Sequence, residues 1–217
     1  MAYRGLETIR RGNTAACVKD IFEIHFQDAK SVLDVTYGKG RFWNWPNDLD
    51  IIGMDIDPPG PVDIIGDYRQ IPLKAGSVDV LTFDPMFLFS RGIRAVNGSK
   101  RHFMGAEAAN YEGRTWSKQD IVRPRNPKDL LEHYRRIFEQ RDIAKQGIIL
   151  KGQDLVTSTR RDWWSFHVYN LALEMGMGEP TDILVQHSPA SRMRDPRWKN
   201  QYFLRAAHCT YFVYKYA

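Results

Sequence analysis

Cysteine is scarce in this sequence of 217 residues, which contains only Cys17 and Cys209. Two cysteines are too few for a disulfide framework or a cysteine-rich metal cluster, and they are typical of a protein from a reducing compartment. The six histidines show no His-x-x-x-His spacing, so the sequence predicts no bound metal ion. A Ser–His–Asp hydrolase motif is also absent.

Long apolar runs are missing as well. A membrane-spanning helix needs about 20 consecutive apolar residues, and no run in this sequence approaches that length. The N-terminal residues Met1-Ala2-Tyr3-Arg4 are followed by charged residues rather than by an apolar segment of the kind found in a signal peptide. We therefore expect a cytoplasmic protein that has no membrane partner.

The composition is that of an ordinary globular domain, with 43% hydrophobic and 26% charged residues. The length favours one domain over residues 1–217, and the sequence leaves open whether it is a monomer or a homodimer. The formal charge is +5, and the excess gathers in two segments, a loop insertion at about 88–127 and a connection at about 187–208. Basic and aromatic residues interleaved in this way are typical of nucleic-acid binding, although solvated loops are often basic too. The candidate contacts are Arg91, Arg94, Lys100, Arg101, Arg192, Arg194, Arg197 and Lys199.

Short apolar runs alternate with segments of helical periodicity. This alternation predicts a mostly parallel sheet that is covered by helices on both faces. The predicted strands are 31–35, 51–55, 78–83 and 146–151, followed by 182–186 and 209–214, which are expected to pair antiparallel at the sheet edge. The predicted helices are 15–28, 130–138 and 163–175.

Glycines and acids follow the predicted parallel strands at the points where ligands bind in open α/β sheets. Gly38 and Gly40 follow the first strand and allow close approach of a ligand to the backbone, and Asp55 follows the second, where a carboxylate can hold ribose hydroxyls. Trp43 stands where the dinucleotide fingerprint has its third glycine. This departure indicates a nucleoside without a pyrophosphate, for which S-adenosylmethionine is suitable.

After the third strand comes Asp84-Pro85-Met86-Phe87, which resembles the Asp-Pro-Pro-Tyr/Phe motif of DNA methyltransferases that modify adenine N6 or cytosine N4. The resemblance implies that the Asp84 side chain and the Pro85 carbonyl accept hydrogen bonds from the target amine, and that Phe87 stacks on a flipped base. Met86 replaces the second proline of the motif. Read without the resemblance, Asp84 before a proline could be a turn residue only.

Further segments resemble the same family in its small phage-type members. Residues 33–40 resemble its cofactor glycine motif, residues 66–73 resemble the segment whose acid contacts adenine, and residues 149–154 resemble a Lys-x-Gln-Asp strand exit. The resemblance implies a Rossmann-like class I methyltransferase fold, with a seven-stranded, mostly parallel sheet and an antiparallel edge strand. It also implies a cofactor site for S-adenosylmethionine that is formed by Asp34, Thr36, Tyr37, Gly38, Gly40, Asp55, Ile56, Asp67, Tyr68 and Asp84.

Two other functions remain open from the sequence. The acceptor could be RNA or a small molecule, because the same geometry suits any planar amine. Met86 also leaves open a catalytically silent module that binds the cofactor and nucleic acid. The role of Lys151 and Asp154 is open as well: they form a surface pair or belong to the site. Trp163 and Trp164 are expected to pack in the core.

Overall fold

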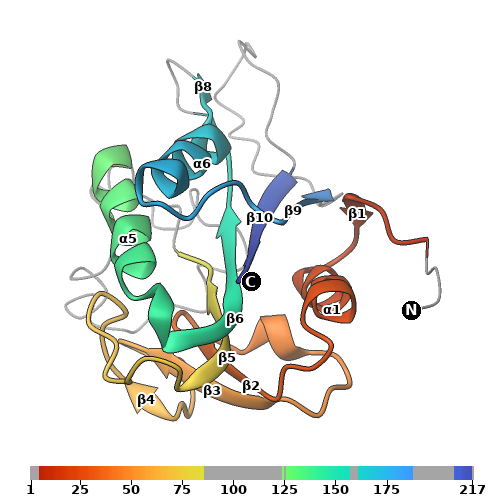
Figure 1. The fold of residues 1–217 in the computed structure, drawn as a ribbon, viewed down its shortest axis with the longest axis vertical. Coiled ribbons are helices and arrows are strands. Elements are labelled where there is room, and N and C mark those ends of the chain that lie inside the picture. Colours follow the sequence, from red (N-terminus) through yellow and green to blue (C-terminus); the bar gives the residue numbers. More distant parts are fainter. Residues whose placement is uncertain (1–4, 86–123, 125, 157–160, 188–207, 217) are drawn as a thin grey trace, which may run out of the picture.

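The computed structural model describes residues 5–85, 124, 126–156, 161–187 and 208–216. An eight-stranded sheet forms the centre of the described chain, with helices on both of its faces (Figure 1). Its strands, in chain order, are β1 (Ile9–Arg11), β2 (Ser31–Asp34), β3 (Asp50–Asp55), β4 (Ile64–Ile65), β5 (Val78–Phe83), β6 (Ala144–Gly152), β9 (Asp182–His187) and β10 (His208–Lys215). A separate small ribbon pairs β7 (Leu155–Val156) with β8 (Arg161–Asp162).

The strand order across the sheet is β1-β9-β10-β6-β5-β2-β3-β4. Neighbouring strands from β6 to β4 are parallel, and β10 is antiparallel to both β6 and β9. This order, with a crossover back from β4 to β5, is that of the Rossmann-like class I methyltransferase fold, so the predicted fold class is confirmed. The parallel strands end at one edge of the sheet, which we call the carboxyl edge.

Two details of the sheet differ from the prediction. The sheet has an eighth strand, because the short β1 adds in parallel to β9. The antiparallel strand β10 lies inside the sheet, between β6 and β9, rather than at its edge. The six consecutive residues Cys209–Tyr214 are buried, and an inside position gives their backbone groups partners on both sides.

The helices begin at sequence signals of the expected kind. The helix α1 (Thr14–His25) begins after Asn13, whose side chain accepts a hydrogen bond from the Ala16 N–H. The helix α5 (Pro127–Glu139) has Asn126 as its N-cap and a proline in its first turn. The third helix is α6 (Trp164–Glu174), and two 3-10 turns, η1 (Arg41–Trp43) and η3 (Arg141–Ile143), complete the described helical elements.

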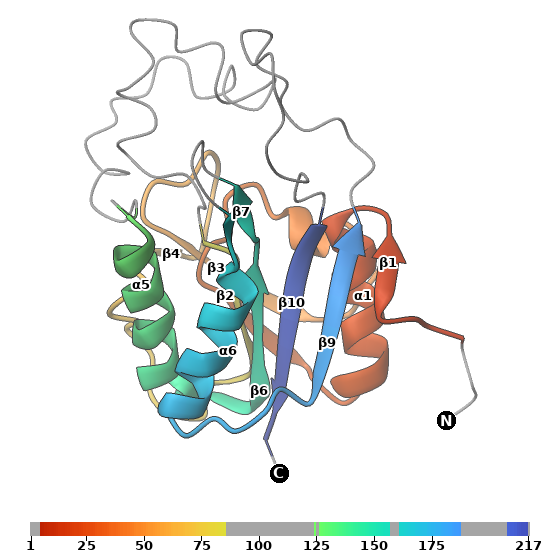
Figure 2. The same ribbon diagram turned by 90° about the horizontal axis from the view of Figure 1, so that it is seen from above.

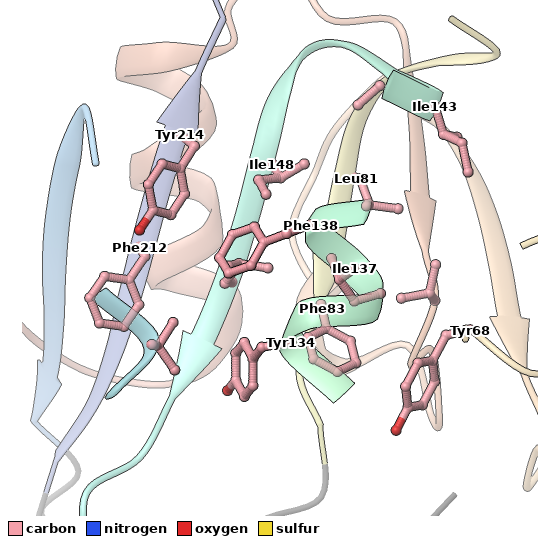
Figure 3. Packing of buried hydrophobic residues seen from close by; sticks show 14 of the residues in the cluster. Tyr68, Leu81, Phe83, Tyr134, Ile137, Phe138, Ile143, Ile148, Phe212 and Tyr214 are labelled. Atoms are coloured by element: carbon pink, nitrogen blue, oxygen red, sulfur yellow. The ribbon is translucent and has the colours of Figure 1, made fainter. Parts of the chain in front are cut away.

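The helices divide between the two faces of the sheet: α5 and α6 lie on one face and α1 lies on the other (Figure 2). Strand β5 is buried along its whole length, and its side chains alternate between the two layers. Leu81 and Phe83 point toward α5, where they pack with Tyr134, Ile137 and Phe138 (Figure 3). The core prediction holds for Trp164, which is buried, and is wrong for Trp163, whose exposed fraction is 48%.

The segment between β2 and β5 is unusually poor in helix. Residues 35–77 are all described, and their only helical element is the three-residue turn η1. The aromatic side chains Phe42, Trp43 and Trp45, from η1 and the turn after it, pack in the buried layer around α1. The indole of Trp43 also donates a hydrogen bond to Asp34 at the end of β2.

Candidate functional site at the carboxyl edge

The glycine turn after β2 is held against the end of β3 by a carboxylate. Gly38 and Gly40 have φ angles of 54° and 65°, a left-handed conformation that favours glycine. The Gly38 N–H donates to Oδ2 of Asp55 at 2.9 Å, and the Asp57 N–H donates to Oδ1 of Asp55 at 2.9 Å. Ile56 lies half-buried in this turn. The structure thus brings together the predicted residues Gly38, Gly40 and Asp55.

The Tyr37 ring occupies the space that two glycines leave open. A Cβ atom at Gly40 would lie 2.7 Å from the Tyr37 hydroxyl oxygen, and one at Gly53 would lie 2.8 Å from the ring carbons. The Tyr37 N–H also donates to the Met54 carbonyl at 3.1 Å. Tyr37 therefore acts as a packing element of the turn. The sequence did not identify Gly53, because its role depends on the Tyr37 ring, which reaches it from the turn after the neighbouring strand β2.

Asp34 is a buried carboxylate beneath η1, with an exposed fraction of 3%. Its Oδ2 accepts a hydrogen bond from Trp43 Nε1 at 2.9 Å, and its Oδ1 accepts from the Thr36 N–H at 3.1 Å. Burial raises the pKa of Asp34 from 3.8 to about 7; the two hydrogen bonds oppose this rise, and repulsion from Asp84 and Asp55 adds to it. Three carboxylates from β2, β3 and β5 therefore influence one another at the carboxyl edge.

Asp84 follows β5 directly and is fixed at both its backbone and its side chain. The Asp84 N–H donates to Oγ1 of Thr36 at 2.8 Å, which links the predicted acceptor residue to the predicted cofactor turn. On its other side, Oδ2 of Asp84 accepts from Nζ of Lys151 at 2.7 Å. Pro85 is buried. This geometry makes Asp84 more than a turn residue.

The expected surface pair of Lys151 with Asp154 is not formed. Lys151 lies at the end of β6 and reaches Asp84, because β5 and β6 pair in parallel. Asp154 is buried at 3% exposure; its Oδ1 accepts from the Ser165 N–H at the start of α6, and its Oδ2 lies 3.2 Å from Nε2 of His208. One residue of the predicted pair therefore belongs to the site, and the other anchors α6.

Asp67 and Tyr68 are engaged with other side chains. Arg69 forms a fork on Asp67, with Nη2 at 2.6 Å from Oδ2; partial burial alone would raise the pKa of Asp67, but the hydrogen bonds and charge of Arg69 outweigh it and lower that pKa. The Tyr68 hydroxyl lies 2.7 Å from Nδ1 of His133 on α5, and its ring packs edge-on against Phe83. The Tyr68 side chain therefore ties the segment to the core, and we do not place it among the ligand-binding groups.

The remaining predicted site residues lie outside the described residues. These are Met86, Phe87 and the basic set Arg91, Arg94, Lys100, Arg101, Arg192, Arg194, Arg197 and Lys199. Within the described ranges, no group of three or more histidine, cysteine or acidic side chains could hold a metal ion. In the same ranges, no helix combines the length and the apolar character that crossing a bilayer requires.

Comparisons with known proteins found only distant structural likenesses. A scan against protein-family models gave no match, and a search of curated proteins gave none either. Among solved structures, a SAM-dependent methyltransferase from Methanosarcina mazei is similar over 90% of this chain and 96% of its own, with 10% identity and a TM-score of 0.47. A protein from Pyrococcus horikoshii OT3 is similar over 91% of this chain and 87% of its own, with 13% identity and a TM-score of 0.45. A SAM-dependent methyltransferase from Aquifex aeolicus is similar over 93% of this chain and 97% of its own, with 12% identity and a TM-score of 0.37. These likenesses are too distant to assign an activity.

Proposed function

We propose that this protein is an S-adenosylmethionine-dependent methyltransferase that modifies an exocyclic amine of a nucleobase, with DNA as its acceptor. The observation that carries the proposal is the hydrogen bond from the Asp84 N–H to Oγ1 of Thr36, at 2.8 Å. This bond joins the residue that resembles an amine acceptor to the turn that resembles a methyl-donor site. The DNA specificity rests on the resemblance and on the basic segments of the sequence.

The polar groups around Asp55 suit the nucleoside part of the cofactor. Each Asp55 oxygen accepts one backbone N–H, and a carboxylate oxygen has two lone-pair positions, so each oxygen keeps capacity for a ribose hydroxyl. Among the described residues, a Cβ at Gly38 would have no neighbour closer than 3.8 Å, so these residues leave the turn open to a ligand. When bound, S-adenosylmethionine supplies a methyl group on a positively charged sulfur, which keeps the electron pair of the broken bond.

The acceptor chemistry falls to Asp84 and Pro85. An exocyclic amine is a weak nucleophile because its lone pair is delocalised into the ring. The Asp84 carboxylate and the Pro85 carbonyl accept hydrogen bonds from the two amine protons, which directs the nitrogen lone pair toward the methyl group and reduces the entropic part of the barrier. After the nitrogen–carbon bond forms, the surplus proton on nitrogen passes to the Asp84 carboxylate and then to solvent.

The test is uptake of tritiated methyl groups from S-adenosylmethionine, with genomic DNA, total RNA and free nucleosides as separate acceptors. Mass spectrometry of the digested product then identifies the modified base. We expect label in DNA, as N6-methyladenine or N4-methylcytosine. Label in RNA alone, or in nucleosides alone, would show that this molecule rather than DNA is the acceptor. Binding of the cofactor and of DNA without any methyl transfer would favour the catalytically silent module.

A matched pair of variants tests the role of Asp84. Asp84→Asn removes the charged acceptor, and we expect methyl transfer to fall by at least about 100-fold while cofactor binding, measured by calorimetry, is largely retained. Asp79→Asn is the control, because Asp79 lies on the same strand but at its opposite end, where Lys30 and Ser31 bind it. Transfer by folded Asp79→Asn should match wild type. Wild-type transfer by Asp84→Asn would refute the assignment.

A further inference from the structure

Lys151 is placed in the site by the register of the sheet. Phe83 of β5 pairs with Leu150 of β6, so the residues that follow them, Asp84 and Lys151, leave neighbouring strands side by side. Lys151 is also opposite Tyr211 on β10, and the Tyr134 hydroxyl of α5 donates to the Lys151 carbonyl. The backbone that carries this ammonium group is therefore fixed from three elements.

The ammonium group of Lys151 is largely removed from water. The exposed fraction of the Lys151 side chain is 13%, and that of the Asp84 side chain is 26%. Nζ lies 5.5 Å from the centre of the Phe42 ring and 5.9 Å from that of Tyr211, within the range of cation–π attraction. Ion pairs between fully exposed side chains contribute little. This pair differs because both charges are partly desolvated, so water screens their attraction less.

We propose that Lys151 is a positioning residue for the methyl-accepting site: its ammonium group holds Oδ2 of Asp84 and leaves Oδ1 to accept a hydrogen bond from the substrate amine. The inference rests on the proposed function. It adds a residue whose role is to fix the direction of the acceptor. The Asp84 N–H on Thr36 fixes the backbone and Lys151 holds Oδ2, and within the described residues Oδ1 keeps its capacity to accept hydrogen bonds.

Four described groups have a pKa that is shifted in part by the charge of Asp84 or Lys151: Asp34 on β2, Cys17 on α1, Tyr134 on α5 and Tyr211 on β10. Burial raises the pKa of Cys17 to about 12, and it raises the pKa of each tyrosine well above its usual 10, so these three are neutral near pH 7. Ionised Asp34 repels Asp84, and the Lys151 ammonium offsets that repulsion.

The chain supplies a control pair of the same kind. Lys145 lies on the same strand as Lys151, and its Nζ is 3.4 Å from Oδ1 of Asp79 on β5. That pair lies at the opposite end of β5 and β6 from the carboxyl edge, and the Lys145 side chain is 56% exposed. Lys145→Met therefore removes a lysine–aspartate pair between the same two strands without touching the site.

The experiment compares Lys151→Met, Lys151→Arg and Lys145→Met with wild type. Two quantities are measured: kcat for transfer of the tritiated methyl group to DNA, and the dissociation constant for DNA without methyl donor. For Lys151→Met we expect kcat to fall at least about tenfold, with DNA affinity little changed.

The charge-preserving variant separates positioning from simple structural loss. Lys151→Arg should recover most of the wild-type kcat, and Lys145→Met should keep it. The inference is overturned if Lys151→Met behaves as Lys145→Met does, or if Lys151→Arg is as impaired as Lys151→Met while circular dichroism shows both variants folded. A wild-type protein that transfers no methyl group to any of the three acceptors contradicts the proposed function instead, so the two failures are distinguishable.

Discussion

The buried carboxylate of Asp34 should make the stability of this protein depend on pH in an unusual direction. Asp34 is 3% exposed, and burial raises its pKa from 3.8 to about 7. A carboxyl group whose pKa is higher in the folded state stabilises the fold fully below its unfolded pKa. That stabilisation is lost as the pH rises through the folded pKa. Wild type should therefore lose the contribution of Asp34 between about pH 4 and pH 7.

The size of this change in stability follows from the pKa shift of Asp34. A rise of about 3 pKa units at 1.36 kcal/mol per unit corresponds to about 4 kcal/mol of unfolding free energy. Asp34→Asn removes the titration. Its amide cannot accept from both the Trp43 Nε1–H and the Thr36 N–H, but that loss does not change with pH. The free energy of unfolding of Asp34→Asn minus that of wild type should therefore increase steadily from pH 5 to pH 7 and level off above.

The assay is urea unfolding of wild type and Asp34→Asn at pH 5, 6, 7 and 8, followed by tryptophan fluorescence. Asp48→Asn serves as the control, because the Asp48 side chain is exposed. The difference between Asp48→Asn and wild type should be small and constant over the same range. A constant difference for Asp34→Asn, from pH 5 to pH 8, would show that the buried carboxylate does not titrate there, and it would refute the reasoning.

Three further perturbations test the structure away from the reaction. Asp79→Asn should lower the free energy of unfolding by about 2 kcal/mol at pH 7. Burial alone would raise the pKa of Asp79. The N–H groups of Lys30 and Ser31 and the charge of Lys145 outweigh burial and lower that pKa, so the folded state favours the ionised carboxylate. This difference should vanish as the pH falls through the folded pKa, and urea unfolding that shows an undiminished difference in acid would contradict it. Gly147→Ala places a Cβ against the Tyr214 carbonyl and 3.0 Å from the Lys215 Cα, so it should destabilise by at least about 2 kcal/mol; an unchanged melting temperature would argue against the β6–β10 register. Trp43→Phe removes the indole donor to Asp34 and should cost about 1–3 kcal/mol at pH 8 in urea unfolding, a loss that should disappear in the Asp34→Asn background.

Much of the fold is local enough to be predicted from the sequence. The buried strands β2, β3, β5 and β6 are short apolar runs followed by turn residues, and their order along the chain, with helical segments between the later ones, indicates a parallel sheet. The ends of those strands carry Gly38, Asp55 and Asp84. Because the carboxyl ends of parallel strands meet at one edge, the sequence alone was enough to place these three residues together.

The partners of those residues were decided by the tertiary structure. Lys151 meets Asp84 across 67 positions because β5 and β6 pair in one particular register, and a shift by one residue would turn either side chain to the opposite face of the sheet. Trp43 donates to Asp34 because the short turn η1 after β2 places the indole next to the end of that strand. A sequence pattern records which residues alternate and where a strand ends. It does not record how two strands are aligned or how deeply a carboxylate is buried, and these two quantities set the charge and the direction of the groups in the site.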